Sequence, residues 1–342
     1  MLFVENPELR GKFPLAMDTQ RDRLVSALLA ITQHLDRPEI LVPYLEQLAA
    51  DHRKFDVKPE HFDAVGRALI AALRRFAGSL WSPELESAWV QAYGFIARTM
   101  VAGVEKAARL PAWWEGEIVG HERRTNDIAV ITVRTDQPFP YRPGQYVSVE
   151  TPWFPGVWRP YSMANAPRAD GLIQFHVKAI SVGWVSSALV RKAQPGHVIR
   201  LGAPVGSMVI DPASPRDVLC VAGGTGLAPI KAIVEDLARW DSPRSVYVFF
   251  GARRLHELYD LAAMRRLSSR LPQLTVVTAV SEDTSFHGEH GLLPDVIARY
   301  GPWHTHDVFA SGSPPMITAT LNRLLTLGVP QAHIRYDAFG EG

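Results

Sequence analysis

Apolar residues at positions 1–110 recur every three to four residues, the spacing of one face of an α-helix. Leu24, Leu28 and Ile31 show this spacing, and it returns at 89–100. No stretch of this part alternates apolar and polar residues as a half-buried strand would. The pattern therefore predicts an all-α domain at the start of the chain.

The pattern changes after the pair of tryptophans that ends at Trp114. Residues 128–133 and 145–149 are short runs rich in β-branched side chains, separated by turns rich in proline and glycine. Such runs are typical of a small antiparallel barrel. We therefore expect an antiparallel β-barrel domain over residues 113–213.

A third pattern occupies residues 214–342. The apolar run 218–222 is followed by a glycine turn, a helical stretch at 229–237 and a second apolar run at 246–250. Alternation of strand and helix predicts parallel strands joined by crossover helices. The expected fold is multidomain: all-α, then a β-barrel, then an α/β nucleotide-binding domain with a parallel sheet.

Composition restricts the classes of function. The 342 residues are too many for one ordinary core, and a formal net charge of +1 argues against a nucleic-acid-binding surface. No apolar run reaches about 18 residues, so no membrane span is expected. The single cysteine, Cys220, cannot form an internal disulfide, which suits a reducing compartment. With no basic and apolar leader sequence, we expect a cytoplasmic enzyme that acts on small molecules.

The sequence Arg159-Pro-Tyr-Ser162 is the first candidate for cofactor chemistry. Arginine, an aromatic ring and a hydroxyl are suited to handling phosphate and stacking on a planar group. On a strand, Arg159 and Tyr161 would point to one face and Ser162 to the other.

A second candidate follows about twenty residues later, at Gly183-Trp-Val-Ser186. Glycine and serine at a helix N-terminus allow close backbone approach and leave N–H donors and the positive end of the helix dipole for a phosphate. An ordinary helix cap has the same pattern, and the sequence leaves that alternative open.

Two further turns lie in the α/β part. The first follows an apolar strand and opens a helix, and it consists of Gly223, Gly224, Thr225 and Gly226. Glycine-rich loops in this context bind pyrophosphate, although a purely structural tight turn remains the alternative. The second follows the apolar run 308–311 and contains Gly312 and Pro314.

Taken in order, these elements resemble the ferredoxin-reductase superfamily. The resemblance implies that Arg159 meets the pyrophosphate of FAD, that Tyr161 stacks on the isoalloxazine and that Ser162 hydrogen-bonds the ring. The turn after Ser311 resembles the superfamily's nicotinamide loop, in which cysteine is usual at that position. Phe339 resembles the terminal aromatic residue that covers the flavin until nicotinamide displaces it.

The choice between NADH and NADPH stays open. Arg253 and Arg254 follow the second strand, where an acid would select a free ribose hydroxyl and an arginine could hold a 2′-phosphate. Two solvated surface arginines are the alternative. Related flavin domains with a Gly-Ala-Arg turn commonly use NADH, so NADH is expected and NADPH is possible.

The helical part resembles the globin domain of bacterial flavohaemoglobins. The resemblance rests on Phe13, Gln20, His52 and the stretch 57–61, in that order, and together with the reductase part it covers essentially the whole chain. It implies that His52 is the proximal ligand of the iron of haem b and that Phe13 packs on the porphyrin. Gln20 and Leu24 would lie on the distal side. For His52 alone, a surface histidine is the alternative.

Three departures from the family pattern bear on the haem. The chain begins where the family's third helix begins, so two helices and the distal tyrosine are expected to be absent, unless Met1 is an internal methionine of a longer gene product. An uncovered haem face would weaken haem retention. Phe62 stands where a tyrosine is expected, and Val104, beside Glu105, stands where a glutamate is expected. Without these partners the imidazole of His52 should donate less electron density to iron. The pattern resembles a divergent subgroup.

The resemblance implies a nitric oxide dioxygenase. Hydride would pass from NAD(P)H to FAD, and single electrons from FAD to haem iron, which binds O₂ and oxidises nitric oxide to nitrate. The alternative is a haem-free flavin reductase that gives electrons to quinones, dyes or iron chelates. A third possibility is a gas- or redox-sensing module, for which the sequence offers no partner surface.

Overall fold

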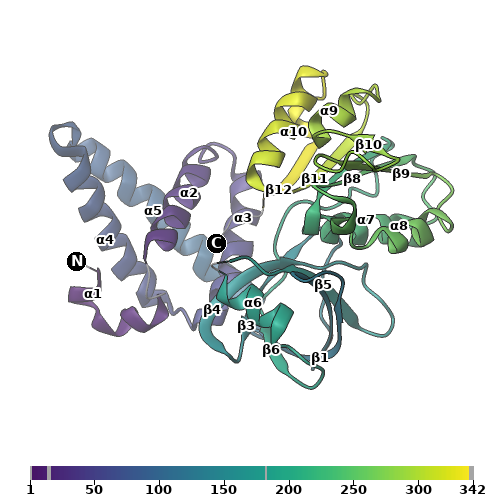
Figure 1. Ribbon diagram of the computed structural model, residues 1–342. Coiled ribbons are helices and arrows are strands. Elements are labelled where there is room, and N and C mark those ends of the chain that lie inside the picture. The colour runs from purple at the N-terminus through teal and green to yellow at the C-terminus, as the bar shows by residue number, and fades with distance from the viewer. Residues whose placement is uncertain (1, 14–16, 182, 339–342) are drawn as a thin grey trace. The chain divides into compact units, whose positions relative to one another are not determined.

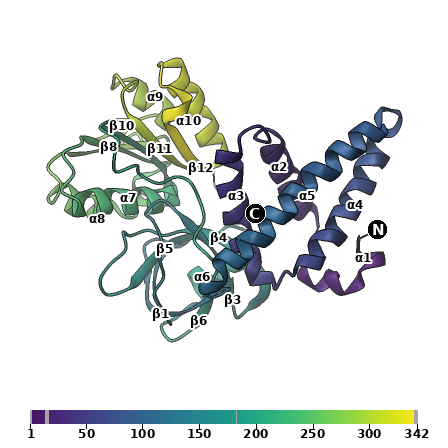
Figure 2. The same ribbon diagram turned by 180° about the vertical axis from the view of Figure 1, so that it is seen from behind.

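The computed structural model describes residues 2–13, 17–181 and 183–338, with the backbone alone at 18–20, 22–23 and 30. The chain divides into two compact units, Met1–Trp113 and Trp114–Gly342. Figures 1 and 2 show the elements of both units from opposite sides.

The described part of the first unit is helical and contains no strand. Its α-helices are α1 (Leu2–Glu5), α2 (Asp18–Thr32), α3 (Pro38–His52), α4 (Pro59–Ala77) and α5 (Pro83–Lys106). Short 3-10 helices link them: η1 (Pro7–Lys12), η2 (Arg53–Phe55), η3 (Gly78–Leu80) and η4 (Ala107–Arg109). Helices α3, α4 and α5 each begin with proline, whose missing N–H would have no partner in the first turn.

One face of α3 forms the core of this unit. Leu41, Leu45 and Ala49 recur every four residues and are buried, because this spacing places them on one side of the helix. They pack in one cluster with residues of α5. At Gly103 of α5, an added Cβ would lie 2.9 Å from the Cβ of Ala49, so glycine is what lets α3 and α5 approach this closely.

The second unit begins with a six-stranded antiparallel sheet in the order β4-β3-β6-β1-β2-β5. Its elements are β1 (Trp114–Arg123), β2 (Ile128–Thr135), β3 (Tyr146–Thr151), β4 (Phe154–Ser162), β5 (Leu172–Lys178), α6 (Trp184–Arg191) and β6 (Val198–Leu201). An antiparallel bridge between Met163 and Phe175 joins the two edges, so the sheet curls into the predicted barrel.

The rest of this unit is a parallel sheet in the order β10-β9-β8-β7-β11-β12. Its strands are β7 (Val218–Gly223), β8 (Val246–Ala252), β9 (Leu274–Val280), β10 (Glu289–His290), β11 (Asp307–Gly312) and β12 (Ile334–Ala338). Its helices are η5 (Gly224–Gly226), α7 (Leu227–Arg239), η6 (Leu255–Glu257), α8 (Leu261–Ser268), α9 (Leu293–Ala298), α10 (Pro314–Thr326) and η7 (Gln331–His333).

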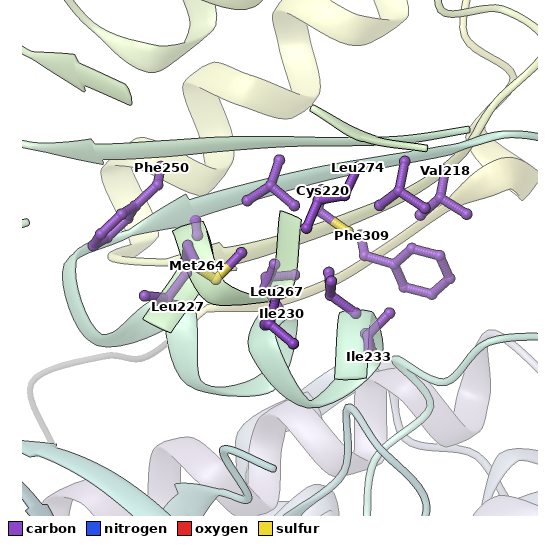
Figure 3. Close-up of a cluster of buried hydrophobic side chains, with 14 of the residues drawn as sticks. Val218, Cys220, Leu227, Ile230, Ile233, Phe250, Met264, Leu267, Leu274 and Phe309 are labelled. Carbon is purple, nitrogen blue, oxygen red and sulfur yellow. The ribbon is translucent and has the colours of Figure 1, made fainter. Parts of the chain in front are cut away.

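Alternate residues of the central strands serve opposite faces of the parallel sheet. In β7, Val218 and Cys220 belong to a cluster with α7 and α8, whereas Leu219 and Val221 belong to a cluster with α9 and α10. Figure 3 shows the first cluster, with Cys220 and Phe250 of the sheet above Ile230 of α7. Both faces are covered, which explains why β7 is apolar at nearly every position. Burial raises the pKa of Cys220 to about 12, so its thiol is a packing group.

The predicted fold class is confirmed: helical, then antiparallel barrel, then parallel α/β. The last α-helix of the first unit continues to Lys106, beyond the expected 89–100; it contains no proline after Pro83, and Gly103 is accommodated where α5 packs closely on α3. No helix in the described part of the chain is long and apolar enough to cross a membrane.

Candidate functional site

Strands β7 and β11 lie side by side at the centre of the parallel sheet. The chain runs from β7 outward through β8 and β9 on one side, and from β11 to β12 on the other. In open α/β sheets, ligands bind outside the carboxyl ends of the strands at such a reversal of strand order. The glycines that end β7 and β11, Gly223 and Gly312, mark this point in the present chain.

The two predicted glycine turns are in contact at this point. An added Cβ on Gly226 would lie 2.2 Å from the backbone oxygen of Ser311 and 2.8 Å from the amide nitrogen of Gly312. An added Cβ on Gly312 would lie 3.4 Å from the Cα of Gly223. The structure thus brings together two turns that are almost ninety residues apart in the sequence.

At Gly224, the backbone of the turn η5 faces open space. Gly224 has a φ of +54°, and a Cβ there would have no atom within 4 Å. Thr225 is half-buried, and α7 begins at the next residue but one, Leu227. Pro314 is the first residue of α10, as expected for a helix that starts directly after a turn. The backbone N–H groups of η5 therefore lie at the end of the β7–β11 pair, an arrangement suited to phosphate, whereas α10 begins with two prolines, which have no N–H.

Among the described residues, two buried polar side chains near this point have no hydrogen-bond partner. Ser311 of β11 is in register with Asp337 of β12, and the Ser311 hydroxyl and the Asp337 Oδ2 are both buried and unpartnered. Burial raises the pKa of Asp337 to about 6. The sequence analysis did not single out Asp337. The adjacent aromatic pattern drew attention to Phe339, which lies outside the described residues.

The predicted flavin residues lie on β4, at the edge of the antiparallel sheet. Ser162 ends the strand, and its hydroxyl is buried and forms no hydrogen bond with any residue that the structure describes. Tyr161 is half-buried and packs against the barrel core, and burial raises the pKa of its hydroxyl. The guanidinium of Arg159 donates to the carbonyl of Trp158 at 3.0 Å. A buried, unsatisfied hydroxyl is the feature expected where a polar ligand group belongs, so Ser162 fits a bound flavin.

Gly183 and Ser186 form a compact turn at the start of α6. The Ser186 hydroxyl donates to the carbonyl of Gly183 at 3.1 Å and accepts from the amide of Ile180 at 3.3 Å. A Cβ on Gly183 would lie 2.4 Å from the Ile180 side chain, so glycine is needed for the turn itself. The helix-cap alternative therefore accounts for both residues, and a phosphate would use the backbone amides at this helix start.

Arg253 and Arg254, at the end of β8, are both engaged with carboxylates. Arg253 is paired with Glu257 at 3.1 Å, and Arg254 lies 3.4 Å from Glu282. Glu257 also accepts the backbone amides of both arginines at 3.1 Å. Glu257 lies several residues beyond the turn in the sequence, so the pattern of the turn itself contains no acid. Hydrogen bonds from the Arg253 side chain and the Arg254 amide lower the pKa of Glu257 despite the opposing effect of burial.

His52 is the last residue of α3, and its ring is held by the preceding turn. Its Nδ1 lies 2.7 Å from the carbonyl oxygen of Leu48. Because a carbonyl only accepts, Nδ1 carries the ring proton and Nε2 keeps its lone pair. Burial lowers the pKa of His52, which favours the neutral imidazole. A neutral ring with Nδ1 bonded to a backbone carbonyl is the usual state of a histidine that binds a metal through Nε2.

Two positions at which the flavohaemoglobin pattern has polar groups hold apolar side chains in this chain. Phe62 is buried in the core of the first unit, Val104 packs against the same cluster, and Glu105 is exposed. The only hydrogen bond found for the His52 ring in the described part of the chain is the one to Leu48. The imidazole is therefore oriented by a neutral carbonyl.

The other predicted haem residues lie before and on α2. Phe13 is half-buried after η1, with its ring 5.1 Å from that of Phe3. Leu24 is exposed on α2, as are Val25 and Leu29. A run of exposed apolar side chains is suited to an apolar group such as a porphyrin. Of Gln20 only the backbone is described, so the predicted position of its side chain is untested.

A cavity of about 530 Å³ lies elsewhere in the first unit, between α4 and α5. Its lining includes Gly66, Ile70, Tyr93 and Ala97 but no residue of α2 or α3. It is therefore separate from the predicted haem residues. Among the described residues, no group of three or more His, Cys, Asp or Glu side chains could hold a metal ion. Haem iron needs only one protein ligand, so His52 alone suffices.

Comparison with protein families gives three matches along the chain. The globin family matches residues 1–100, the oxidoreductase FAD-binding domain family residues 115–210, and the oxidoreductase NAD-binding domain family residues 220–322.

Similar proteins fall into two groups. A protein named flavohemoprotein from Rhodopirellula baltica is 28% identical, over 99% of this chain and 90% of that protein. The ferredoxin–NAD(P)⁺ reductase component of the naphthalene 1,2-dioxygenase system of Pseudomonas putida is 33% identical, over 67% of this chain and 69% of that protein. Among solved structures, the flavohemoglobin of Malassezia yamatoensis with bound FAD and heme covers 99% of this chain and 92% of its own, with a TM-score of 0.82. At 20% identity, that last likeness shows the fold alone.

Proposed function

Because this chain belongs to the flavohaemoglobin family, a globin domain followed by FAD- and NAD-binding oxidoreductase domains, we propose that it is a nitric oxide dioxygenase. Electrons from NAD(P)H would pass through FAD to haem, and nitric oxide would be oxidised by O₂ to nitrate. The observation that carries this proposal is the His52 ring, held by the Leu48 carbonyl with Nε2 left to bind iron. A cytoplasmic location, expected from the sequence, stays a prediction.

The reductase half would place its two cofactors at the carboxyl end of β7. The Gly223–Gly226 turn would hold the pyrophosphate of the nicotinamide cofactor through backbone N–H groups. The contact between Gly226 and Ser311 keeps the two turns together. Ser162 would hydrogen-bond the flavin ring, and Arg159 would meet the flavin pyrophosphate. FAD, when bound, converts a hydride into single electrons, and haem supplies an iron that binds O₂.

The globin half would hold haem through His52, with Phe13 on the porphyrin and Leu24 and Gln20 on the distal side. The Leu48 carbonyl orients the imidazole, and the positions of its polar partners in the flavohaemoglobin pattern hold Phe62 and Val104, which are apolar. A proximal ring bonded only to a neutral carbonyl donates less electron density than one bonded to a carboxylate. We therefore expect a higher iron reduction potential than a carboxylate-paired histidine would give.

The test uses the full chain loaded with haem and FAD. Anaerobic NADH should bleach the flavin bands and shift the Soret band, and aerobic NADH should support consumption of nitric oxide. His52→Ala should lose the Soret band while it keeps NADH-dependent reduction of ferricyanide. Haem-loaded protein that consumes no nitric oxide under these conditions would refute the dioxygenase proposal.

A second candidate function is an NAD(P)H:acceptor flavin reductase without haem. It is favoured by the 33% identity, over 67% of this chain, to a ferredoxin–NAD(P)⁺ reductase component. The identity to the flavohemoprotein is lower, at 28%. It predicts ferricyanide or quinone reduction by protein that takes up no haem. An NADH-dependent shift of a haem spectrum would exclude it.

The nicotinamide preference follows from the β8 turn. Both arginines there already face carboxylates, and Glu257 would repel a 2′-phosphate. NADH is therefore the proposed cofactor. A comparison of kcat/KM for NADH and NADPH tests this directly, and a higher value for NADPH would contradict it.

A further inference from the structure

Strand β5 contacts both the barrel and the α/β part of the second unit. Its barrel-facing side chains are Ile173, Phe175 and Val177. The alternate side chains, Gln174, His176 and Lys178, lie on the other face of the strand and meet the α/β part. Gln174 Oε1 lies 3.3 Å from Lys231 Nζ of α7. One strand face therefore joins the FAD-binding barrel to the NAD-binding sheet.

His176 is the centre of this junction. Its side chain is fully buried, and its Nδ1 lies 2.7 Å from the hydroxyl of Tyr259. Its Nε2 makes no hydrogen bond to any described residue and lies 3.8 Å from the buried Oδ2 of Asp260, which is paired with Lys231 only at the longer distance of 3.5 Å. Two buried polar atoms that could bond each other are thus held about 1 Å beyond hydrogen-bond distance.

The cationic side chains around Asp260 also lie farther from its carboxylate than a normal hydrogen bond. Lys231 Nζ lies 3.5 Å from Asp260 Oδ2, and Arg124 Nη2 lies 3.8 Å from Asp260 Oδ1. By contrast, the buried pair of Arg244 and Asp307 inside the α/β domain is closed, at 2.7 Å. Buried charges are costly unless their hydrogen bonds are made, so the longer distances around Asp260 contrast with the closed Arg244–Asp307 pair.

The protonation states of His176 and Tyr259 allow a hydrogen bond to form between His176 Nε2 and Asp260 Oδ2. Burial, then the charges of Lys231 and Arg124, lowers the pKa of His176 well below its ordinary value. Burial raises the pKa of Tyr259, so its hydroxyl keeps its proton. When Tyr259 donates to Nδ1, the ring proton of His176 resides on Nε2, and an approach of about 1 Å lets it bond to Asp260.

We propose that His176 and Asp260, with Tyr259 and Lys231, form a latch between the FAD-binding and NAD-binding domains that closes when the nicotinamide cofactor binds. The inference rests on the hydride transfer in the proposed function. β5 also contacts η5, so a shift of this strand reaches the turn that would hold the cofactor. These are positioning residues: a misplacement of 1 Å between reacting groups can slow a reaction by about 100-fold.

The test is stopped-flow reduction of bound FAD at saturating NADH, followed at the flavin band. His176→Gln and Asp260→Asn should lower the reduction rate constant by roughly 10- to 100-fold. Tyr259→Phe, which removes one hydroxyl, should lower it by a smaller factor. NADH deuterated at the transferred position should give a larger isotope effect in these variants, because the hydride step becomes slower. FAD content should stay close to that of the parent protein. Asp260→Asn leaves buried Lys231 without its facing carboxylate, so its melting temperature should fall, and rates are compared below that temperature on FAD-loaded protein.

Lys178→Gln is the matched control. Lys178 lies on the same strand face, but it is partly exposed and lies 3.6 and 3.9 Å from Asp127 and Glu257. This control should retain the parental rate, because exposed ion pairs contribute little. An unchanged rate in His176→Gln and Asp260→Asn overturns the latch, and so does a slower rate that is matched in Lys178→Gln or explained by lost FAD. A parent protein whose FAD is not reduced by NADH refutes the proposed function itself.

Discussion

The contact between Gly226 and Ser311 can be tested with a series of glycine-to-alanine substitutions. In Gly226→Ala, the new Cβ would lie 2.2 Å from the Ser311 oxygen, about 1.2 Å short of the 3.4 Å at which ordinary contact begins. The other close atoms, 2.5 and 2.8 Å away, are also backbone atoms of Ser311 and Gly312. No side chain can rotate away, so β11 and η5 must separate.

The expected cost follows from the kind of atom that each added Cβ meets. Overpacking costs typically about 1–3 kcal/mol, and a clash between backbone atoms belongs at the upper end of that range. Gly224→Ala meets no atom but has a φ of +54°, which costs roughly 1 kcal/mol. Gly223→Ala meets the flexible end of Met316 at 3.0 Å, which can shift, so its cost should stay below about 1 kcal/mol.

Thermal unfolding and NADH titration would measure these effects. A loss of about 3 kcal/mol lowers Tm by roughly 6–12 °C in a unit of this size. Gly226→Ala should show this loss and bind NADH weakly. Gly171→Ala is the control for backbone strain alone, because Gly171 has a φ of +68° with no atom within 4 Å and lies in a turn before β5. The reasoning is refuted if Gly226→Ala is no less stable than Gly224→Ala and Gly171→Ala.

Three further substitutions test single groups. Ser162→Ala should leave the FAD-free protein as stable as before, because no hydrogen bond is lost, but weaken FAD binding by about 2- to 10-fold, as measured by flavin titration. Asp337→Asn should remove the contribution of the Asp337 carboxyl to the pH dependence of the free energy of unfolding. The raised pKa of about 6 means that the parent is stabilised at low pH and loses up to about 3 kcal/mol relative to the variant as the pH rises from 4 through 6. Denaturant unfolding of the parent and of Asp337→Asn at several pH values measures this. If the reasoning is wrong, their free energies of unfolding will differ by the same amount at every pH. Tyr93→Phe removes the bond from its hydroxyl to the Phe62 carbonyl and should cost about 1 kcal/mol by denaturant unfolding, with no effect on NADH-dependent FAD reduction.

Local patterns in the sequence were enough to predict the elements and their order. Helical spacing, β-branched runs and glycine turns depend on a few neighbouring residues, so they can be recognised without knowledge of the fold. The partner of the His52 ring, Leu48, is also local, one helical turn away, although no pattern in the sequence identified it beforehand. The alternation of Ile173 to Lys178 likewise follows from strand geometry alone.

Tertiary structure decided which distant groups meet. The strand order places β7 beside β11, and only this brings Gly226 against Ser311 and sets Asp337 beside it. The engagement of Arg253 by Glu257 depends on the path of the loop that follows β8. The junction of His176 with Asp260 joins residues from two domains, and no local pattern predicts it. Burial and distance fix the pKa of such groups and the cost of a clash, and both are properties of the packed chain rather than of its sequence neighbours.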